Sequence, residues 1–224
     1  MWRSQAPYSD GGEMKGFRWL KPLLGCVLLL GSGALWAVDG KAQFNPCIAC
    51  HGSKAEGNAA LGAPAIAGQD AAYLQRQLQH FRAGRRGTHK SDTFGAQMRA
   101  AGASTLKDDA AVAAVAAHVA TLPKTRPAAA ANGDLRNGNN LYHGKCGACH
   151  GGRAEGNPAL KAPRLAGLDA AYIRRQFSYF RDGVRGTDPK DVPGRQMAMM
   201  ARTLPTERDL DDVIAFIHQQ GRPQ

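Results

Sequence analysis

Two segments of the chain, residues 70–84 and 169–183, bring apolar and aromatic side chains to one face at the spacing of an α-helix. Asp70 and Asp169 stand at the N-cap positions of these segments, and a glycine ends each of them. We therefore predict two long helices with the same pattern in the two halves of the chain. The shared face consists of Tyr73, Gln77, Leu78 and Phe81 in the first helix and of Tyr172, Gln176, Phe177 and Phe180 in the second.

A last helix is predicted in each half by a narrower apolar stripe. In the first half this helix starts at Asp108, and in the second it starts at Thr206, where Asp209 completes a capping box. The segments between helices are rich in glycine and proline, and none alternates as a strand would. The pattern therefore predicts an all-α fold. The two stripes consist of Val112, Val115 and Val119 and of Leu210, Val213, Ile214 and Ile217.

The two halves of the chain are copies of one unit. The segment CIACHGSKAEGN, residues 47–58, returns as CGACHGGRAEGN at residues 146–157. The offset of 99 residues holds without a gap from Cys47 to Met98. Such self-similarity at a fixed spacing indicates an internal duplication, and therefore two domains of the same fold.

A segment rich in proline and alanine separates the two copies and is interpreted as a linker. We predict domains at residues 38–124 and 134–224, joined by a linker at 125–133. Each domain would have few large aliphatic residues and long irregular segments. Domains this small often need a disulfide, a metal or a cofactor to complete a core. We therefore expect a large apolar group inside each domain.

Each copy contains the motif Cys-x-x-Cys-His, formed by Cys47, Cys50 and His51 in the first and by Cys146, Cys149 and His150 in the second. This motif is the attachment signature of c-type haem. Residues three apart share one face of a helical turn, so both sulfurs can reach the two vinyl groups on one haem edge. The histidine that follows is then placed to bind the iron. The motif predicts two covalently attached haem c groups.

Two other uses of a Cys-x-x-Cys pair are zinc binding and dithiol redox chemistry. A zinc site with four cysteines would have to join the two halves, although each half carries its own complete motif. A redox dithiol of the thioredoxin type needs a strand–helix context that the pattern does not predict. Haem also supplies the missing core, so we favour haem.

The second axial ligands are predicted from the repeat. Iron in electron-carrying cytochromes is often held by His and Met, because the soft thioether raises the reduction potential. Met98 and Met197 align with each other, and each follows a glycine-rich segment, so we expect them outside a helical stripe and bound to iron. The alternative is that they fill the core. The repeat pairs none of the other histidines, interpreted as surface or structural residues: His80, His89, His118, His143 and His218.

Pro64 and Pro163 occur at matching positions after the two motifs. A histidine that binds a metal usually donates its other ring N–H to a fixed acceptor. The carbonyl of a rigid proline could be that acceptor, and the alternative role is a simple loop turn. The Glu-Gly-Asn segments at residues 56–58 and 155–157 are expected to shape a loop.

The N-terminal residues resemble an export signal. Residues 22–36 form an uncharged apolar run that follows Lys15, Arg18 and Lys21 and ends in small residues. The run is shorter than the roughly 20 residues of a membrane span. We therefore predict a cleaved signal peptide at residues 1–37, with an uncleaved membrane anchor as the alternative. Without this segment the chain keeps four cysteines, in an exported and therefore oxidising setting.

The chain is basic, with 29 Lys and Arg against 18 Asp and Glu, a net charge of +11. Setting residues 1–37 aside leaves about +9. This charge favours acidic partners or an anionic lipid surface, or serves solubility. Nucleic acid is excluded as a partner, because an exported chain without a basic helix or an aromatic platform does not fit that role.

These motifs together resemble the di-haem cytochrome c4 family. The sequences CxxCH, APxxAG and AAYxxRQ, followed by FR and a later Met, all occur twice, and the likeness covers essentially the whole chain after residue 37. The resemblance implies two tandem class I cytochrome c domains with pseudo-two-fold symmetry and His–Met iron. It implies haem-binding roles for Cys47, Cys50, His51, Pro64 and Met98, and for Cys146, Cys149, His150, Pro163 and Met197.

The resemblance also implies a function. We expect a periplasmic electron carrier that is not an enzyme and is soluble or peripherally bound to the membrane. Its donor would be a quinol-oxidising complex or a dehydrogenase, and its acceptor a terminal oxidase. Two alternatives stay open. The chain could be the cytochrome subunit of a dehydrogenase, or a haem peroxidase or gas sensor, which would need an open iron site that two paired methionines argue against.

The two copies differ in two places. Residues 38–46 leave little room before the first CxxCH, whereas residues 133–145 can form a helix before the second. We therefore expect a frayed or missing first helix in the first domain. In addition, the spacing from Met98 to Leu106 is one residue longer than the spacing in the second copy.

Overall fold

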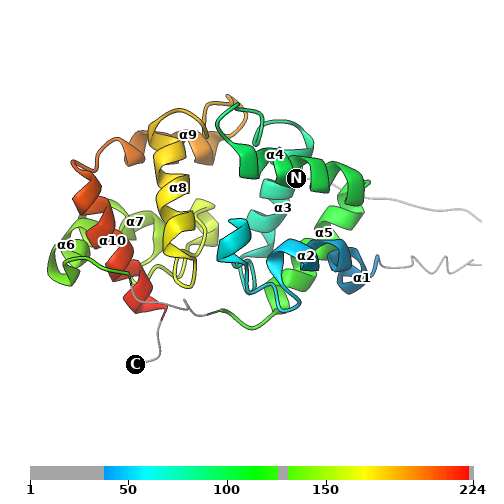
Figure 1. Ribbon diagram of the computed structural model, residues 1–224, viewed down its shortest axis with the longest axis horizontal. Helices are drawn as coiled ribbons and strands as arrows, with labels where there is room; N and C mark the ends of the chain where they lie inside the picture. Colours follow the sequence, from blue (N-terminus) through cyan, green and yellow to red (C-terminus); the bar gives the residue numbers. More distant parts are fainter. Residues whose placement is uncertain (1–37, 126–130, 222–224) are drawn as a thin grey trace, which may run out of the picture. The chain divides into compact units, whose positions relative to one another are not determined.

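The computed structural model describes residues 38–125 and 131–221, so the expected export signal at residues 1–37 lies outside the described residues. Within the described ranges the chain forms helices, short 3₁₀ turns and two isolated bridges, which confirms the all-α prediction (Figure 1). The first domain contains α1 (Gly40–Phe44), α2 (Ile48–His51), α3 (Ala71–Arg82), α4 (Thr93–Thr105) and α5 (Asp109–Thr121). The second contains α6 (Leu135–Lys145), α7 (Gly147–His150), α8 (Ala170–Arg181), α9 (Val192–Ala201) and α10 (Glu207–Gln220). The 3₁₀ turns are η1 (Asn45–Cys47), η2 (Ala59–Leu61) and η3 (Pro158–Leu160).

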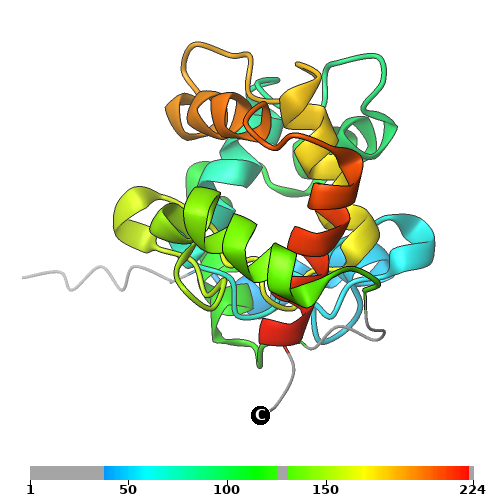
Figure 2. The ribbon, with the colours of Figure 1, turned by 90° about the vertical axis from the view of Figure 1, so that its left-hand side faces the viewer.

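The helices of the two domains pack in the same order. In the first domain α5 packs against α1 and α3, and α3 also packs against α4. In the second, α10 packs against α6 and α8, and α8 also packs against α9. Figure 2 shows the crossing of α6 (green) and α10 (red) from one end of the molecule. The internal duplication is therefore also a duplication of the helix packing.

The predicted helix starts are present. The carboxylates of Asp70 and Asp169 accept backbone N–H groups from the first turns of α3 and α8. Asp108 caps α5 in the same way, and Thr206 and Asp209 form the expected capping box of α10. Each cap satisfies backbone donors that the first turn of a helix leaves unpaired.

Each domain has its own apolar core, built around its last helix. In the first domain the valine stripe of α5 is buried against Phe44, Leu74 and Leu106. In the second domain the stripe of α10 is buried against Tyr142, whose hydroxyl donates to the carbonyl oxygen of Gly151 at 2.7 Å. The helices cross closely, because a Cβ on Gly138 of α6 would come within 2.0 Å of the carbonyl oxygen of Asp212.

The first helix of the first domain is short but present. α1 has 5 residues, against 11 in α6. Asp39 caps it through hydrogen bonds from two backbone N–H groups, and Phe44 at its end is buried in the core. The expectation of a frayed or missing first helix was therefore wrong, because the helix is short but capped and packed into the core.

The two methionines lie inside helices, so the expectation that they stand outside a helical stripe was wrong. Met98 belongs to α4 and Met197 to α9. α4 ends directly before Leu106, whereas α9 ends two residues short of the position before Leu204. Among the described residues, no helix combines the length and apolar character that a membrane crossing requires.

Candidate functional site

The two CxxCH motifs form single helical turns, α2 and α7, that each follow a short lead-in. Cys47 and Cys146 at the start of each motif are half-buried, whereas Cys50 and Cys149 are exposed. No disulfide joins any two of these four cysteines. Each turn ends at a glycine with positive φ, Gly52 at 79° in the first domain, so the chain reverses directly after the histidine.

The histidines of both motifs are buried and held in the same orientation. His51 and His150 are each 8% exposed. The Nδ1–H of His51 donates to the carbonyl oxygen of Pro64 at 2.9 Å, and that of His150 donates to Pro163 at 2.9 Å. Burial lowers the pKa of both imidazoles, and the carbonyl acceptor offsets only part of that shift. A neutral ring with Nδ1 protonated carries its lone pair on Nε2, the form that can bind a metal.

The loop after each motif holds the histidine backbone. The N–H of Gly57 donates to the carbonyl oxygen of His51 at 2.8 Å, and Gly156 makes the equivalent 2.7 Å bond to His150. The loop is then fixed to the segment that contains the proline. In the second domain the buried Ala154, with φ of 58°, accepts N–H groups from the two residues at 165–166. The expectation that residues 56–58 and 155–157 shape the loop is confirmed by these bonds and by the Asn caps of η2 and η3.

One cavity contains the functional groups of the second domain. Cys146, Cys149, His150, Pro163 and Met197 all line it. Its other walls are mostly apolar and come from α8, α10 and the loop before α8, together with residues of the first domain. They include Pro64, Ile66, Tyr73, Leu74, Leu165, Leu168, Ile173, Phe177, Leu210, Val213 and Ile217. The repeat thus brings a thiol pair, a histidine and a methionine to one space.

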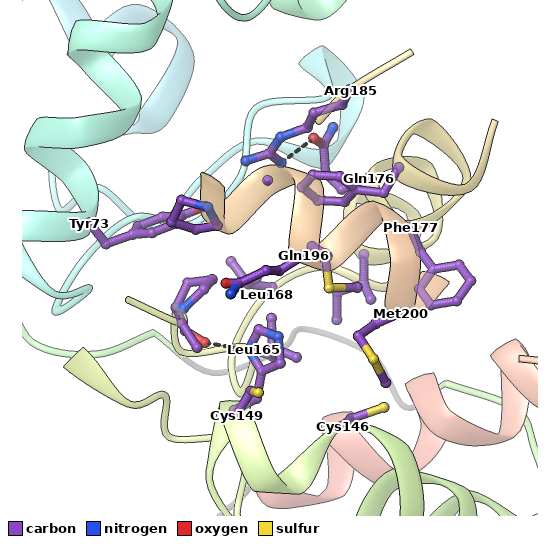
Figure 3. A pocket seen from close by; sticks show the side chains of 18 of the residues that line it. Tyr73, Cys146, Cys149, Leu165, Leu168, Gln176, Phe177, Arg185, Gln196 and Met200 are labelled. Carbon is purple, nitrogen blue, oxygen red and sulfur yellow. Dashed lines mark hydrogen bonds between the residues drawn. The ribbon is translucent and has the colours of Figure 1, made fainter. Parts of the chain in front are cut away.

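The two ends of this cavity differ chemically. Figure 3 shows Cys146 and Cys149 at one end, and Arg185 with its bond to Gln176 at the other. Haem c is attached through the vinyl-derived carbons of one edge and carries two propionate carboxylates on the opposite edge. A cavity with thiols at one end, a guanidinium at the other and apolar walls between therefore fits this group.

The polar end contains two arginines that the sequence analysis missed, together with two glutamines that it placed on the shared helix face without a role. Gln77 and Gln176 each accept hydrogen bonds from both Arg86 and Arg185, at 2.7 to 3.0 Å. The Nε atoms of both arginines are buried without a hydrogen-bond partner in the described part of the chain. The internal repeat could have identified these residues, because Gln77 matches Gln176 and Arg86 matches Arg185 at the 99-residue offset.

The thiols do not have the properties of a redox dithiol. Reactive pairs have depressed thiol pKa values. Here burial raises the pKa of Cys146 to about 11, and burial together with Cys50 raises the pKa of Cys47. In residues 38–125 and 131–221, no group of three His, Cys, Asp or Glu side chains is placed to hold a metal ion.

The remaining histidines are scattered. His89 and His143 are exposed, and His143 contacts Phe216 edge-on. His118 packs against Phe44. Two others, His80 and His218, are buried at 4% and 5% exposure. These two are therefore structural residues and not surface residues.

Comparison with known proteins supports the duplicated fold. The cytochrome c family matches residues 37–123 and again residues 135–221. A thiosulfate dehydrogenase electron acceptor of Stutzerimonas stutzeri (strain A1501) is 34% identical over 81% of this chain and 87% of its own length. Cytochrome c4 of Azotobacter vinelandii is 31% identical over 80% of this chain and 90% of its own length. The crystal structure of reduced recombinant cytochrome c4 from Pseudomonas stutzeri superposes with a TM-score of 0.61 at 25% identity, covering 80% of this chain and 95% of that one.

These likenesses agree with the site. Two family matches coincide with two CxxCH motifs, so the chain binds two covalently attached haem c groups. One relative is named an electron acceptor and another is named cytochrome c4, and this chain is a di-haem electron carrier. The chain belongs to the cytochrome c family, as a member with two tandem domains of the cytochrome c4 type.

Proposed function

We propose that the chain is a periplasmic carrier that accepts electrons from a dehydrogenase of the thiosulfate-oxidising class and delivers them to a terminal oxidase. The 34% identical relative is named as the electron acceptor of thiosulfate dehydrogenase, which supports this donor. The apolar run at residues 22–36 supports export. A quinol-oxidising complex is the second candidate donor, because other relatives are named cytochrome c4.

The proposed axial ligands are His51 and Met98 in the first domain and His150 and Met197 in the second. The observation that carries this proposal is the cavity of the second domain, where the thiols, His150 and Met197 line one space. Bound haem would supply reversible one-electron chemistry, and ligation by both the histidine and the methionine of each domain would favour electron transfer over binding of oxygen or peroxide.

The protein's own groups set the conditions for that chemistry. The Nδ1–H bond from His150 to Pro163 fixes the ring, so Nε2 keeps one direction when the charge at the site changes. The apolar walls exclude water, which limits the rearrangement that accompanies a change of charge. A thioether ligand favours the reduced state, so Met98 and Met197 would keep both potentials high.

The ligand assignment is tested by the visible spectrum of the reduced holoprotein with and without carbon monoxide. We expect no change in the wild type, because both iron positions are filled. Met98→Ala and Met197→Ala should each open one site and bind one equivalent of carbon monoxide. Met199→Ala, on an exposed side chain of the same helix as Met197, is the matched control and should bind none. Ready binding to one haem of the wild type would favour the peroxidase or sensor alternative.

The donor assignment is tested by stopped-flow reduction. Thiosulfate dehydrogenase with thiosulfate should reduce the protein quickly, and the rate should fall with ionic strength because the basic carrier attracts an acidic partner. A quinol-oxidising complex with quinol is the comparison donor. Faster reduction by the quinol-oxidising complex would replace the proposed donor, and fast turnover with thiosulfate by the isolated protein would show a catalytic subunit instead of a carrier.

A further inference from the structure

Hydrogen bonds between the two domains occur in matched pairs. In each pair, the second bond joins the repeat counterparts of the residues in the first. Arg76 donates to the carbonyl oxygen of Lys161 at 2.8 Å, and its counterpart Arg175 donates to that of Gly62 at 2.6 Å. The shared bonds of Arg86 and Arg185 to the two glutamines follow the same rule. The domains are therefore joined with local pseudo-two-fold symmetry, and a departure from that symmetry marks a position where the two haem domains differ.

One such departure lies at the end of the long helices. Position 80 of α3 is His, and its counterpart on α8 is Tyr179. Each side chain crosses the interface to the segment that starts the methionine helix of the other domain. The Tyr179 hydroxyl donates to the carbonyl oxygen of Ser91 at 3.1 Å. His80 instead faces a carboxylate, with its Nδ1 at 3.6 Å from Oδ2 of Asp191.

Asp191 connects this contact to the second domain's methionine helix. It is the N-cap of α9, and its Oδ1 accepts the N–H of Gly194 at 2.9 Å. Its other oxygen faces His80, and both side chains are buried, at 6% and 4% exposure. The cap is tight, since a Cβ at Gly194 would lie 2.1 Å from Oδ2 of Asp191. A change at Oδ2 therefore acts directly on the first turn of the helix that carries Met197.

The contact between His80 and Asp191 is at ion-pair distance but slightly long for an ordinary hydrogen bond, and Nδ1 of His80 has no other hydrogen-bond partner in the described residues. The charged groups nearby are Arg185, whose charge acts on Asp191, and Asp92, whose charge acts on Arg86 and Tyr179. Burial raises the pKa of Asp191, but His80, Gly194 and Arg185 outweigh it, so the net pKa is lowered. The carboxylate is therefore charged at neutral pH.

We infer that His80 of the first domain is a positioning residue for α9 of the second, and that its protonation makes the reduction potential of the second haem depend on pH while the first haem, faced by Tyr179, lacks this dependence. Imidazole is the side chain that normally titrates between pH 5 and 8. Uptake of one electron at the second haem would be accompanied by uptake of at most one proton from solvent at His80. The inference deepens the proposed electron-carrier function and rests on ligation by Met197.

The sign of the effect follows from charge. Reduction removes one positive charge from the iron centre, so it favours protonation of a nearby group. The potential of the second haem should therefore fall as pH rises through the imidazole range. The fall cannot exceed a tenfold change in the one-electron equilibrium constant per pH unit, which is about 59 mV.

The test is spectroelectrochemical titration of both haems in the full-length holoprotein between pH 5 and pH 8. Met197→His first assigns the second haem, because loss of the thioether should lower the potential of that haem alone. His80→Gln keeps a polar side chain but removes the titration, and His80→Tyr copies the residue of the other half. Both variants should leave the second potential independent of pH. Gln79→Ala, on the same helix, is the matched control and should keep the wild-type dependence.

Three outcomes would overturn the inference. The first is a wild-type second potential that moves by less than a twofold change, about 18 mV, over this range. The second is a pH dependence that persists in His80→Gln. The third is an equal pH dependence of the two wild-type haems. If Met197→His moves neither potential, the ligand assignment fails instead. The role of His80 is then judged by the protection factor of the Gly194 amide, which is its exchange rate relative to that of an unfolded chain at the same pH. This protection should increase on acidification from pH 8 to pH 5 in the wild type but not in His80→Gln.

Discussion

Arg185 of the second domain donates a 2.8 Å hydrogen bond through Nη2 to Oε1 of Gln77 in the first domain. The same oxygen accepts Nη1 of Arg86 at 2.8 Å. One amide oxygen thus accepts a hydrogen bond from each of two guanidinium groups, as the oxygen of Gln176 also does. Since a buried charge is costly when its hydrogen bonds are lost, this amide should be important for stability.

Gln77→Ala should lower the free energy of unfolding of the holoprotein by about 2–3 kcal/mol, because it leaves one N–H of each arginine unpaired. Thermal or guanidinium unfolding followed by circular dichroism measures the change. Gln79→Ala, two residues along α3, is the control and should cost less than about 1 kcal/mol. An equal cost for the two variants would show that the amide bonds contribute little.

Gly138→Ala should be strongly destabilising, by about 2–4 kcal/mol, because its Cβ would overlap the carbonyl of Asp212 and force α6 away from α10. Gly144 lies on the same helix, and a Cβ there would meet no atom within 4 Å. Gly144→Ala should therefore stabilise the protein by up to about 1 kcal/mol through helix propensity alone. Comparing the two variants separates the steric clash at the crossing of α6 and α10 from the effect of helix propensity. Stabilisation by both substitutions would contradict the predicted clash.

Thr206→Ala should cost about 1 kcal/mol, because it removes the side-chain acceptor of the α10 capping box. Thr203, a few residues before it, bonds only the carbonyl of Met200 at the end of α9. Thr203→Ala should stay within about 0.5 kcal/mol of the wild type. Urea unfolding midpoints at constant slope provide the comparison, and a similar shift in both variants would argue against the cap.

Asp191 should contribute to stability in acid solution with a definite sign. Its pKa is lowered in the folded protein, so its stabilisation is complete above the unfolded value of about 3.9 and is lost as pH falls through the folded value. Asp191→Asn should therefore be less stable than the wild type at pH 6, and the difference should shrink towards pH 2. Melting temperatures measured across this range check the prediction. Asp182→Asn, at an exposed position, is the control; a constant difference for Asp191→Asn would contradict the linkage.

Much of the fold could be predicted because its signals are local. Asp70, Asp108 and Asp169 mark helix starts that depend only on a carboxylate and the N–H groups just after it. The CxxCH turns and the proline contacts also lie close in sequence, since His51 and Pro64 are 13 residues apart. Because of the internal repeat, each of these motifs occurs twice, and the 99-residue offset identifies the equivalent residues in the two domains.

The methionine helices were missed for a physical reason. The glycine-rich segments before Met98 and Met197 led us to expect these methionines outside a helical stripe. Gly95 and Gly194 nevertheless lie in the first turns of helices, where a Cβ would have no space. A Cβ at Gly95 would stand 2.0 Å from Oδ2 of Asp92, the residue that caps the helix. The tight cap therefore selects glycine inside a helix, which imitates the composition of a loop.

The interface between the domains could not be predicted in the same way. Arg86 and Arg185 follow the long helices in short glycine-rich segments, where a basic residue usually faces solvent. Their partners in the other domain are 90 and 108 residues away, and no pattern within a window of one or two helices predicts contacts at such a separation. Only the pairing of these positions by the repeat distinguished them from ordinary surface charges.

The paired arginine bonds across the interface have a consequence for the origin of the chain. A face on which residue i meets residue j, while the copy of i meets the copy of j, is the isologous face of a homodimer. A single-domain ancestor that carried this face would have been complementary to itself. Fusion of two genes for such a subunit would have made the dimer permanent, and positions 80 and 179 would then have been free to diverge, as no homodimer of identical subunits allows.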